Sequence, residues 1–180
     1  EMQKDFDHIK QIFTKQIRLS PFDPKKKINL LIDGANGSGV GYVLYQHVND
    51  EDPGGEVVII NANSSALKEN QMNYSAIDTE ILGLKFAVES NQYYLYGAPE
   101  INVFTDANSI EGIFQKNLGD IENKRIQRMV AKMMPFRFKF HHIPGKSNKI
   151  ADCLSRLTRQ IRETEHFELA DPILADHAVI

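Results

Sequence analysis

The sequence predicts an α/β domain in which helices flank a mixed β-sheet. Two short apolar runs, Ile28–Asp33 and Ile101–Asp106, have the length of buried strands, and each ends in an aspartate. A long amphipathic helix, from Ser75 to about Tyr94, lies between them. A strand, a helix and a second strand form a crossover connection, so we expect the two strands to run parallel.

An antiparallel meander is predicted to open the sheet. Gly37 and Gly39 allow a tight turn from the first strand into a second, Val40–Gln46, and a polar turn then leads to a third, Glu56–Ile60. Asp33 lies at the end of the first strand, where a carboxylate is poorly solvated and needs a partner, usually a cation. The simpler alternative is an aspartate that caps the turn.

The helix from Ser75 carries an acid on its apolar face. Its predicted buried stripe consists of Ile77, Ile81, Leu84 and Val88. Glu80 falls on the same face, where an ionised and unpaired carboxylate would cost several kcal/mol. Glu80 is therefore expected either to pair with a lysine or arginine or to bind at a cation site. Asp78, three residues after Ser75, is explained better as a capping residue.

Two further helices and an edge strand are predicted after the second parallel strand. Ser109–Gln115 is a short helix, and Asp120–Met134 is a longer, basic one. The inward residues of the longer helix are predicted to be Ile121, Ile126, Met129, Val130 and Met133. Pro135 ends this helix, and Phe136–Phe140 alternates as an edge strand with one cationic face.

The last predicted helix begins at Ser147 and carries a further acid. Its inward stripe is predicted to consist of Ile150, Leu154 and Leu157. Asp152 lies near the start of this helix and off the stripe, where the helix dipole alone would favour an acid. The tail from Gln160 is acidic and without pattern, and we expect it to be linker or disordered.

Composition fits a single globular domain with short attachments. The chain has 180 residues, of which 42% are hydrophobic and 25% are charged. Its one cysteine, Cys153, excludes an internal disulfide framework and favours a reducing compartment. No apolar run approaches membrane-spanning length, and no signal peptide is recognisable, so we expect no membrane association.

Basic residues concentrate between Lys124 and Arg159. The formal net charge of the chain is −3, which argues weakly against nucleic-acid binding. This segment, however, contains ten lysines and arginines and one acid, so it carries +9 against −12 for the remainder. Such a block can form a surface that faces phosphates. The alternative is a solvated face of a helix.

Four carboxylates occupy positions that suit a shared site: two strand ends, a sheet-facing helix and the start of the last helix. They are Asp33, Asp106, Glu80 and Asp152. Asp33 and Asp106 should lie side by side and repel each other unless a divalent cation lies between them. Carboxylates without cysteine or histidine ligands suit magnesium or manganese. Two such ions, about 4 Å apart, can activate water and stabilise the leaving oxygen of a phosphodiester.

Five sequence blocks carry a family resemblance. They are Tyr74–Leu82, Tyr94–Gly97, Thr105–Asp106, Leu118–Asn123 and Ile143–Arg156. In this order they resemble the ribonuclease H domain of gypsy-type LTR retrotransposon reverse transcriptases, and the last block is the most specific.

The resemblance implies a ribonuclease H-like fold, with a five-stranded mixed sheet of three antiparallel strands and then parallel crossovers, flanked by helices. It implies an endonuclease that hydrolyses the RNA strand of RNA–DNA hybrids with two Mg²⁺ ions, which Mn²⁺ can replace, and with no small-molecule cofactor. The catalytic and metal-binding residues would be Asp33, Glu80, Asp106 and Asp152.

Contacts to the hybrid are predicted from the first hairpin turn, from the residues after Asp106 and from the basic segment. The predicted set is Gly34, Ala35, Asn36, Asn108, Ser109, Lys124, Arg125, Arg128, Lys146 and Asn148. The basic side chains would bind phosphates, and 2′-hydroxyls would distinguish the hybrid from DNA.

The resemblance also predicts how the chain is organised. Residues 27–158 would form the ribonuclease H domain. Residues 1–26, with an amphipathic helix at Glu1–Gln16, resemble a tether from a polymerase domain upstream, and residues 159–180 resemble a linker toward an integrase downstream. The expected location is the cytoplasm, in a retroelement particle, or the nucleus.

Two other functions stay open on the sequence. A catalytically inactive, retroelement-derived module can keep the fold and bind nucleic acid or protein. A metal-dependent nuclease of the same architecture could instead cut duplex DNA.

Overall fold

The computed structural model describes residues 22–52, 54–145 and 148–164. The predicted helix Glu1–Gln16 lies outside these residues, as do Ser147 and the larger part of the predicted C-terminal linker. The last described helix runs to Thr164, past the predicted domain end at residue 158.

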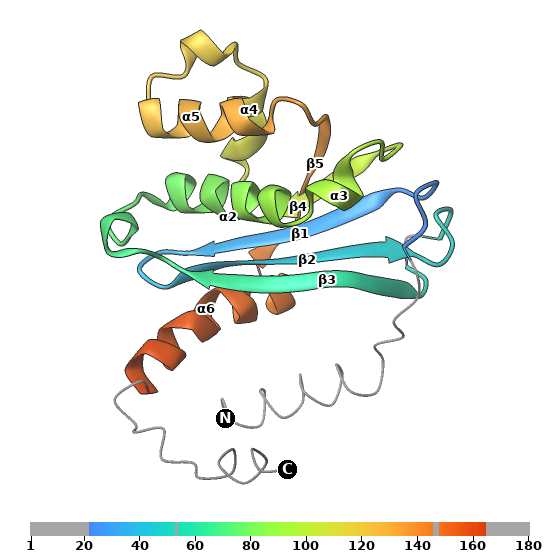
Figure 1. Cartoon of the computed structure of the whole chain (residues 1–180), viewed down its shortest axis with the longest axis horizontal. Helices are drawn as coiled ribbons and strands as arrows, with labels where there is room; N and C mark the ends of the chain where they lie inside the picture. Colours follow the sequence, from blue (N-terminus) through green and yellow to red (C-terminus); the bar gives the residue numbers. More distant parts are fainter. Residues whose placement is uncertain (1–21, 53, 146–147, 165–180) are drawn as a thin grey trace, which may run out of the picture.

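The described residues form one five-stranded mixed sheet with the strand order β3-β2-β1-β4-β5 (Figure 1). The strands are β1 Ile28–Ala35, β2 Gly39–His47, β3 Val57–Ala66, β4 Ile101–Thr105 and β5 Phe138–His142. β1, β2 and β3 are antiparallel neighbours, whereas β4 runs parallel to β1 and β5 runs parallel to β4. The predicted fold class and strand directions are confirmed.

β3 is longer than predicted. It continues to Ala66 because it pairs with β2 along the whole of that strand, from His47 opposite Val57 to Gly39 opposite Ala66. Polar residues in its second half hid this extension in the sequence.

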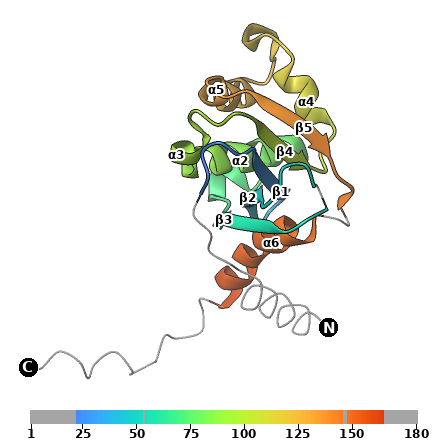
Figure 2. The same ribbon diagram turned by 90° about the vertical axis from the view of Figure 1, so that its right-hand side faces the viewer.

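Helices cover both faces of the sheet, as Figure 2 shows from the side. α2 (Ala76–Ser90) packs on one face and α6 (Lys149–Thr164) on the other. The α2 side also carries α3 (Gln92–Leu95), α4 (Ser109–Phe114), α5 (Lys124–Met133) and the 3₁₀ turns η1 (Glu69–Gln71) and η2 (Leu118–Asp120). The main core lies between this layer and the sheet. No helix among the described residues has both the length and the apolar character needed to cross a bilayer.

α2 begins and ends at polar side chains. Ser75 Oγ accepts from the backbone N–H of Asp78, and the Ser75 backbone N–H donates to the Asp78 carboxylate, which confirms the predicted capping role. The helix was predicted to run to about Tyr94, but it breaks at Asn91. The buried Asn91 amide donates to the Ala87 carbonyl at 2.7 Å and so replaces a backbone donor at the helix end.

α6 packs through smaller residues than predicted. Ala151 and Ser155 are fully buried, whereas Ile150 is 37% exposed. The reason is Gly41 on β2: a Cβ atom there would lie 2.8 Å from Leu154 Cβ and from the Ser155 backbone nitrogen. Only small side chains fit where a helix backbone approaches a sheet this closely.

α5 is shorter than predicted. It starts at Lys124 because the Asn123 side chain accepts from the first backbone amides of the helix. All five predicted inward residues are buried, although Ile121 packs from the preceding loop.

Candidate metal centre

Three of the four predicted acids come together at one end of the sheet. Oxygens of Asp33, Glu80 and Asp106 all lie within 4.8 Å of one another. β1 and β4 are parallel neighbours in the register Leu31 opposite Phe104, so Asp33 and Asp106 leave adjacent strands at the same end. The predicted juxtaposition of these two aspartates is therefore what the structure shows.

Glu80 reaches this cluster because α2 packs closely against β1 at Gly34, which has no side chain. A Cβ atom on Gly34 would lie 2.8 Å from the carbonyl carbon and oxygen of Thr79. Glycine removes that obstacle, and the Gly34 backbone amide then donates a hydrogen bond to the Glu80 carboxylate. Gly34 was predicted to approach nucleic acid; in the structure its absent side chain and its amide place Glu80.

α6 holds Asp33 from the opposite face of the sheet. Ser155 Oγ donates to Asp33 Oδ2 at 2.5 Å, and Asn148 Nδ2 donates to the Ile32 carbonyl at 2.9 Å and to Asp33 Oδ1 at 3.4 Å. Ser155 and Asn148 are both fully buried.

These contacts correct one prediction and add a residue. Asn148 was expected to touch nucleic acid, but its side chain is enclosed and serves Asp33 instead. Ser155 was not predicted at all. The available signal was the pair of small residues Ala151 and Ser155, one helical turn apart, which marks a close helix–sheet contact.

Asp152 lies at the margin of the cluster. Its carboxylate accepts from Arg156 Nε at 2.6 Å, and its side chain is 40% exposed. It is close enough for its charge to raise the pKa of Asp33. Gly145, after β5, also lies against the site, because a Cβ atom on it would come within 2.9 Å of Asp106 Oδ2.

Burial and mutual repulsion raise the pKa of two of the clustered acids. The pKa of Asp33 is raised to about 6, mainly by desolvation. The Ser155 hydrogen bond lowers this pKa, and the charges of Asp152 and Asp106 raise it further. Desolvation, Asp33 and Asp106 together raise the pKa of Glu80 to about 8. A cluster of this kind gains from a bound cation, which would favour the ionised forms.

The donor set fits a hard divalent cation. It consists of carboxylate oxygens alone, which suits magnesium or manganese rather than a metal that prefers sulfur or nitrogen. Oε2 of Glu80 is buried and has no hydrogen-bond partner among the described residues. A buried acceptor without a donor is costly, and a cation would satisfy it.

Comparison with known sequences identifies the family. The model of the RNase H-like domain found in reverse transcriptase matches residues 23–136. The chain belongs to this family. Polyproteins of the transposons Tf2-3 and Tf2-4 of Schizosaccharomyces pombe are 32% identical to it over 160 residues, or 88% of the chain. The chain spans 11% of the length of those polyproteins. The predicted resemblance to a retrotransposon ribonuclease H domain is confirmed.

Solved structures share the RNase H-like fold. The N-terminal RNase H domain of a Mycobacterium tuberculosis protein gives a TM-score of 0.56 at 15% identity, covering 79% of this chain and 99% of that chain. RNase H1 of the archaeon Halobacterium salinarum gives 0.52 at 16% identity, covering 75% and 98%. A foamy viral protease-reverse transcriptase in complex with an RNA/DNA hybrid gives 0.53 at 12% identity, covering 79% and 18%. At these identities the likeness concerns the fold.

The remaining residues predicted to contact nucleic acid differ in accessibility. Asn36 in the β1–β2 turn and Asn108 and Ser109 at the start of α4 are exposed, as are Lys124 and Arg128 on α5. The Ala35 side chain is buried. Lys146 lies outside the described residues.

Arg125 already has partners within the RNase H-like domain. Its Nη1 donates to the buried Asp78 at 3.2 Å, and its guanidinium carbon lies 4.0 Å from the centre of the Tyr74 ring. Asn123 Nδ2 also donates to Asp78, at 3.1 Å. Asp78 thus joins the N-terminal ends of α2 and α5.

Proposed function

We propose that this domain is a divalent-metal-dependent endonuclease that hydrolyses the RNA strand of RNA–DNA hybrids during reverse transcription. The observation that carries the proposal is the cluster of Asp33, Glu80 and Asp106, with its unsatisfied Glu80 oxygen. Support comes from the family, which is found in reverse transcriptases, and from the foamy viral neighbour solved with an RNA/DNA hybrid.

The protein's contribution is to hold carboxylates where two Mg²⁺ ions, or Mn²⁺ ions, would bind. Bound ions of this kind supply Lewis-acid activation of water and of the phosphodiester. Ser155 fixes the orientation of Asp33 from α6, and the Gly34 amide fixes Glu80 from β1. Asp152 is the proposed fourth ligand at the open side, where it would exchange its pairing with Arg156 for a metal.

Exposed polar groups of the β1–β2 turn, of the start of α4 and of α5 are the proposed contacts to the hybrid. Asn36, Asn108 and Ser109 would reach sugar and phosphate groups, and Lys124 and Arg128 would neutralise phosphates. Discrimination against DNA would come from 2′-hydroxyl groups in a wide, shallow minor groove, which is recognition of shape rather than of sequence.

The proposal is tested by incubating the protein with an end-labelled RNA–DNA hybrid and Mg²⁺. Wild type should cut the RNA strand, EDTA should stop the reaction, and Asp106→Asn should abolish cleavage without loss of the fold or of hybrid binding. Glu111→Gln is a matched control, since it neutralises an exposed acid on the neighbouring α4. Cleavage by Asp106→Asn at near wild-type rate would reject the site, and duplex DNA cut as fast as hybrid would reject the substrate.

A second candidate function is a catalytically inactive module that binds nucleic acid or protein. It is favoured by one observation: Asp152 is paired with Arg156 and is not part of the three-acid cluster. Hybrid binding without cleavage, at any protein concentration and with either Mg²⁺ or Mn²⁺, would decide for it.

The setting of the domain is also a proposal. We propose a polymerase domain upstream and an integrase downstream in the same translation product; the support is that the relatives are transposon polyproteins, of which this chain spans 11%, and that the family is found in reverse transcriptase. The domain would then act in the cytoplasm or nucleus, inside a retroelement particle. Immunoblotting with an antibody against residues 27–158 would show whether larger precursors exist.

A further inference from the structure

A basic groove lies between α2 and α5, outside the three-acid cluster. Its volume is about 410 Å³, and its cationic lining consists of Lys85 from α2 and Arg125, Arg128 and Lys132 from α5. The three α5 cations are three and four residues apart and therefore share one face of the helix. Tyr74 lines the same groove, beneath the Arg125 guanidinium.

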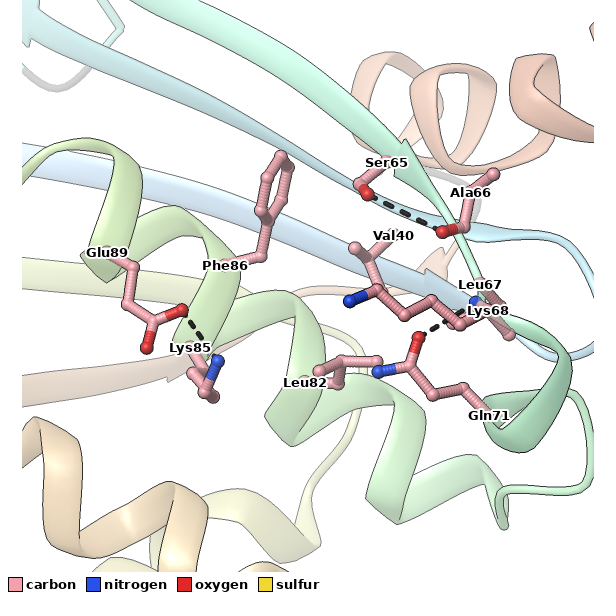
Figure 3. A pocket seen from close by; sticks show the side chains of 10 residues that line it. All are labelled: Val40, Ser65, Ala66, Leu67, Lys68, Gln71, Leu82, Lys85, Phe86 and Glu89. Carbon is pink, nitrogen blue, oxygen red and sulfur yellow. Dashed lines mark hydrogen bonds and ion pairs between the residues drawn. The ribbon is translucent and has the colours of Figure 1, made fainter.

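Two of these cations form ion pairs with one acid, Glu89. Glu89 Oε2 accepts from Lys85 Nζ at 2.6 Å, and Glu89 Oε1 accepts from Lys132 Nζ at 3.2 Å. Figure 3 shows Lys85 and Glu89 joined on α2, beside the adjoining hollow that Lys68 and Gln71 line. Exposed pairs such as these contribute about 0–1 kcal/mol each, so an arriving anion can displace Glu89 at small cost.

The other two α5 cations are also available to an anion. Within the described part of the chain, Arg128 forms no ion pair, and its side chain is exposed. Arg125 uses one edge of its guanidinium on Asp78, and its side chain stays 46% exposed. An arginine has five N–H donors, so Arg125 can bind a phosphate while it keeps the contact to Asp78.

We propose that this groove seats a run of backbone phosphates of the bound nucleic acid, away from the cleavage centre, and that Glu89 holds Lys85 and Lys132 in place until those phosphates arrive. The inference rests on the proposed function and adds Lys85, Lys132 and Glu89 to it. Successive α5 cations rise about 4.5 Å and about 6 Å along the helix axis, so one face of the helix can contact more than one phosphate of a polynucleotide. Guanidinium groups also match phosphate oxygens in geometry.

The test measures the salt dependence of hybrid binding in EDTA, where hydrolysis is blocked. Fluorescence anisotropy with a labelled RNA–DNA hybrid would compare wild type with Arg128→Gln/Lys132→Gln between about 50 and 200 mM salt. Two lost phosphate contacts should lower the slope of log K against log[salt] by about 2 and weaken binding about tenfold at low salt. Glu89→Gln should tighten binding about threefold, because it frees two lysines.

A matched control removes the same charge elsewhere. Lys27→Gln/Lys139→Gln takes two lysines from around Glu100, and the slope should stay within about 0.5 of wild type. All four substituted cations are exposed, so circular dichroism should be unchanged. An unchanged slope in the groove variant, an equal loss in the control, or weaker binding by Glu89→Gln would each overturn the proposal.

Two further measurements distinguish this inference from binding of an acidic protein and from failure of the proposed function. Poly-glutamate that competes as well as the hybrid, at equal charge, would assign the groove to an acidic protein and overturn the assignment to nucleic acid. Cleavage in Mg²⁺ is measured in parallel. If wild type cuts the hybrid but the groove variant binds it normally, only the groove proposal is rejected. If wild type neither binds nor cuts the hybrid, the proposed function is rejected.

Discussion

Replacing Glu80 with glutamine should make the metal-free domain more stable at neutral pH. Burial and the charges of Asp33 and Asp106 raise the pKa of Glu80 from 4.5 to about 8. A folded-state pKa above the unfolded value means that the folded protein holds the proton more tightly. Stability is therefore lost as the pH rises from about 4.5 to about 8.

The size of this effect follows from the pKa values. One pKa unit corresponds to about 1.4 kcal/mol, so the raised pKa of Glu80 lowers the free energy of unfolding by up to about 3 kcal/mol at pH 7 and by less than about 1 kcal/mol at pH 5, because the folded state must take up a proton that the unfolded state has released. Glutamine carries no charge, has nearly the same shape and can still accept from the Gly34 amide. The variant should therefore exceed wild type in free energy of unfolding by up to about 3 kcal/mol at pH 7.

Urea denaturation followed by circular dichroism would measure this difference at several pH values, in EDTA. Wild type and Glu80→Gln should converge toward pH 4.5 and diverge above it, whereas the exposed Glu111→Gln should follow wild type throughout. Mg²⁺ at about 100 times its dissociation constant should stabilise wild type by about 2.7 kcal/mol and the variant by much less. Parallel pH profiles for wild type and variant, with equal stabilisation by Mg²⁺, would refute the assignment of Glu80 to a buried cation site.

Two further predictions concern the support of Asp33. Gly41→Ala should destabilise the fold by about 1–3 kcal/mol in urea denaturation, because its Cβ would collide with α6. Gly112→Ala is the control and should be neutral or stabilising, because its Cβ would enter open space. Equal effects at the two glycines would contradict the close contact at Gly41. Ser155→Ala should cost about 1–3 kcal/mol, since Asp33 loses its shortest hydrogen bond, and should also reduce the thermal shift produced by Mg²⁺. An unaltered Mg²⁺ response in that variant would leave Ser155 with a packing role alone.

Sequence periodicity predicted the parts of this fold in which apolar side chains dominate. The strands β1 and β4, the cap of α2 and the placement of Asp33, Glu80 and Asp106 follow from local patterns and from the geometry of a parallel crossover. Asp152 was recognised through its sequence block, and its pairing with Arg156, four residues later on α6, could have been expected from the helical spacing as well.

The supporting residues escaped prediction for a different reason. The prediction placed the largest apolar residues of α6 on its buried face, as the hydrophobic effect ordinarily favours. The glycine at position 41 reverses that rule, because contact between a helix backbone and a sheet selects the smallest side chains. Ser155 and Asn148 then lie inside, and their hydrogen bonds to Asp33 span more than a hundred residues of sequence.

That long span has a consequence for a chain made from one end to the other. Asp33, Glu80 and Asp106 all precede residue 107, yet the donors that hold Asp33 come from residues 148 and 155. Until α6 has emerged and docked, the first aspartate faces its two acidic neighbours without support. Competence for metal would thus be acquired late in synthesis, after almost all of the domain has already been made.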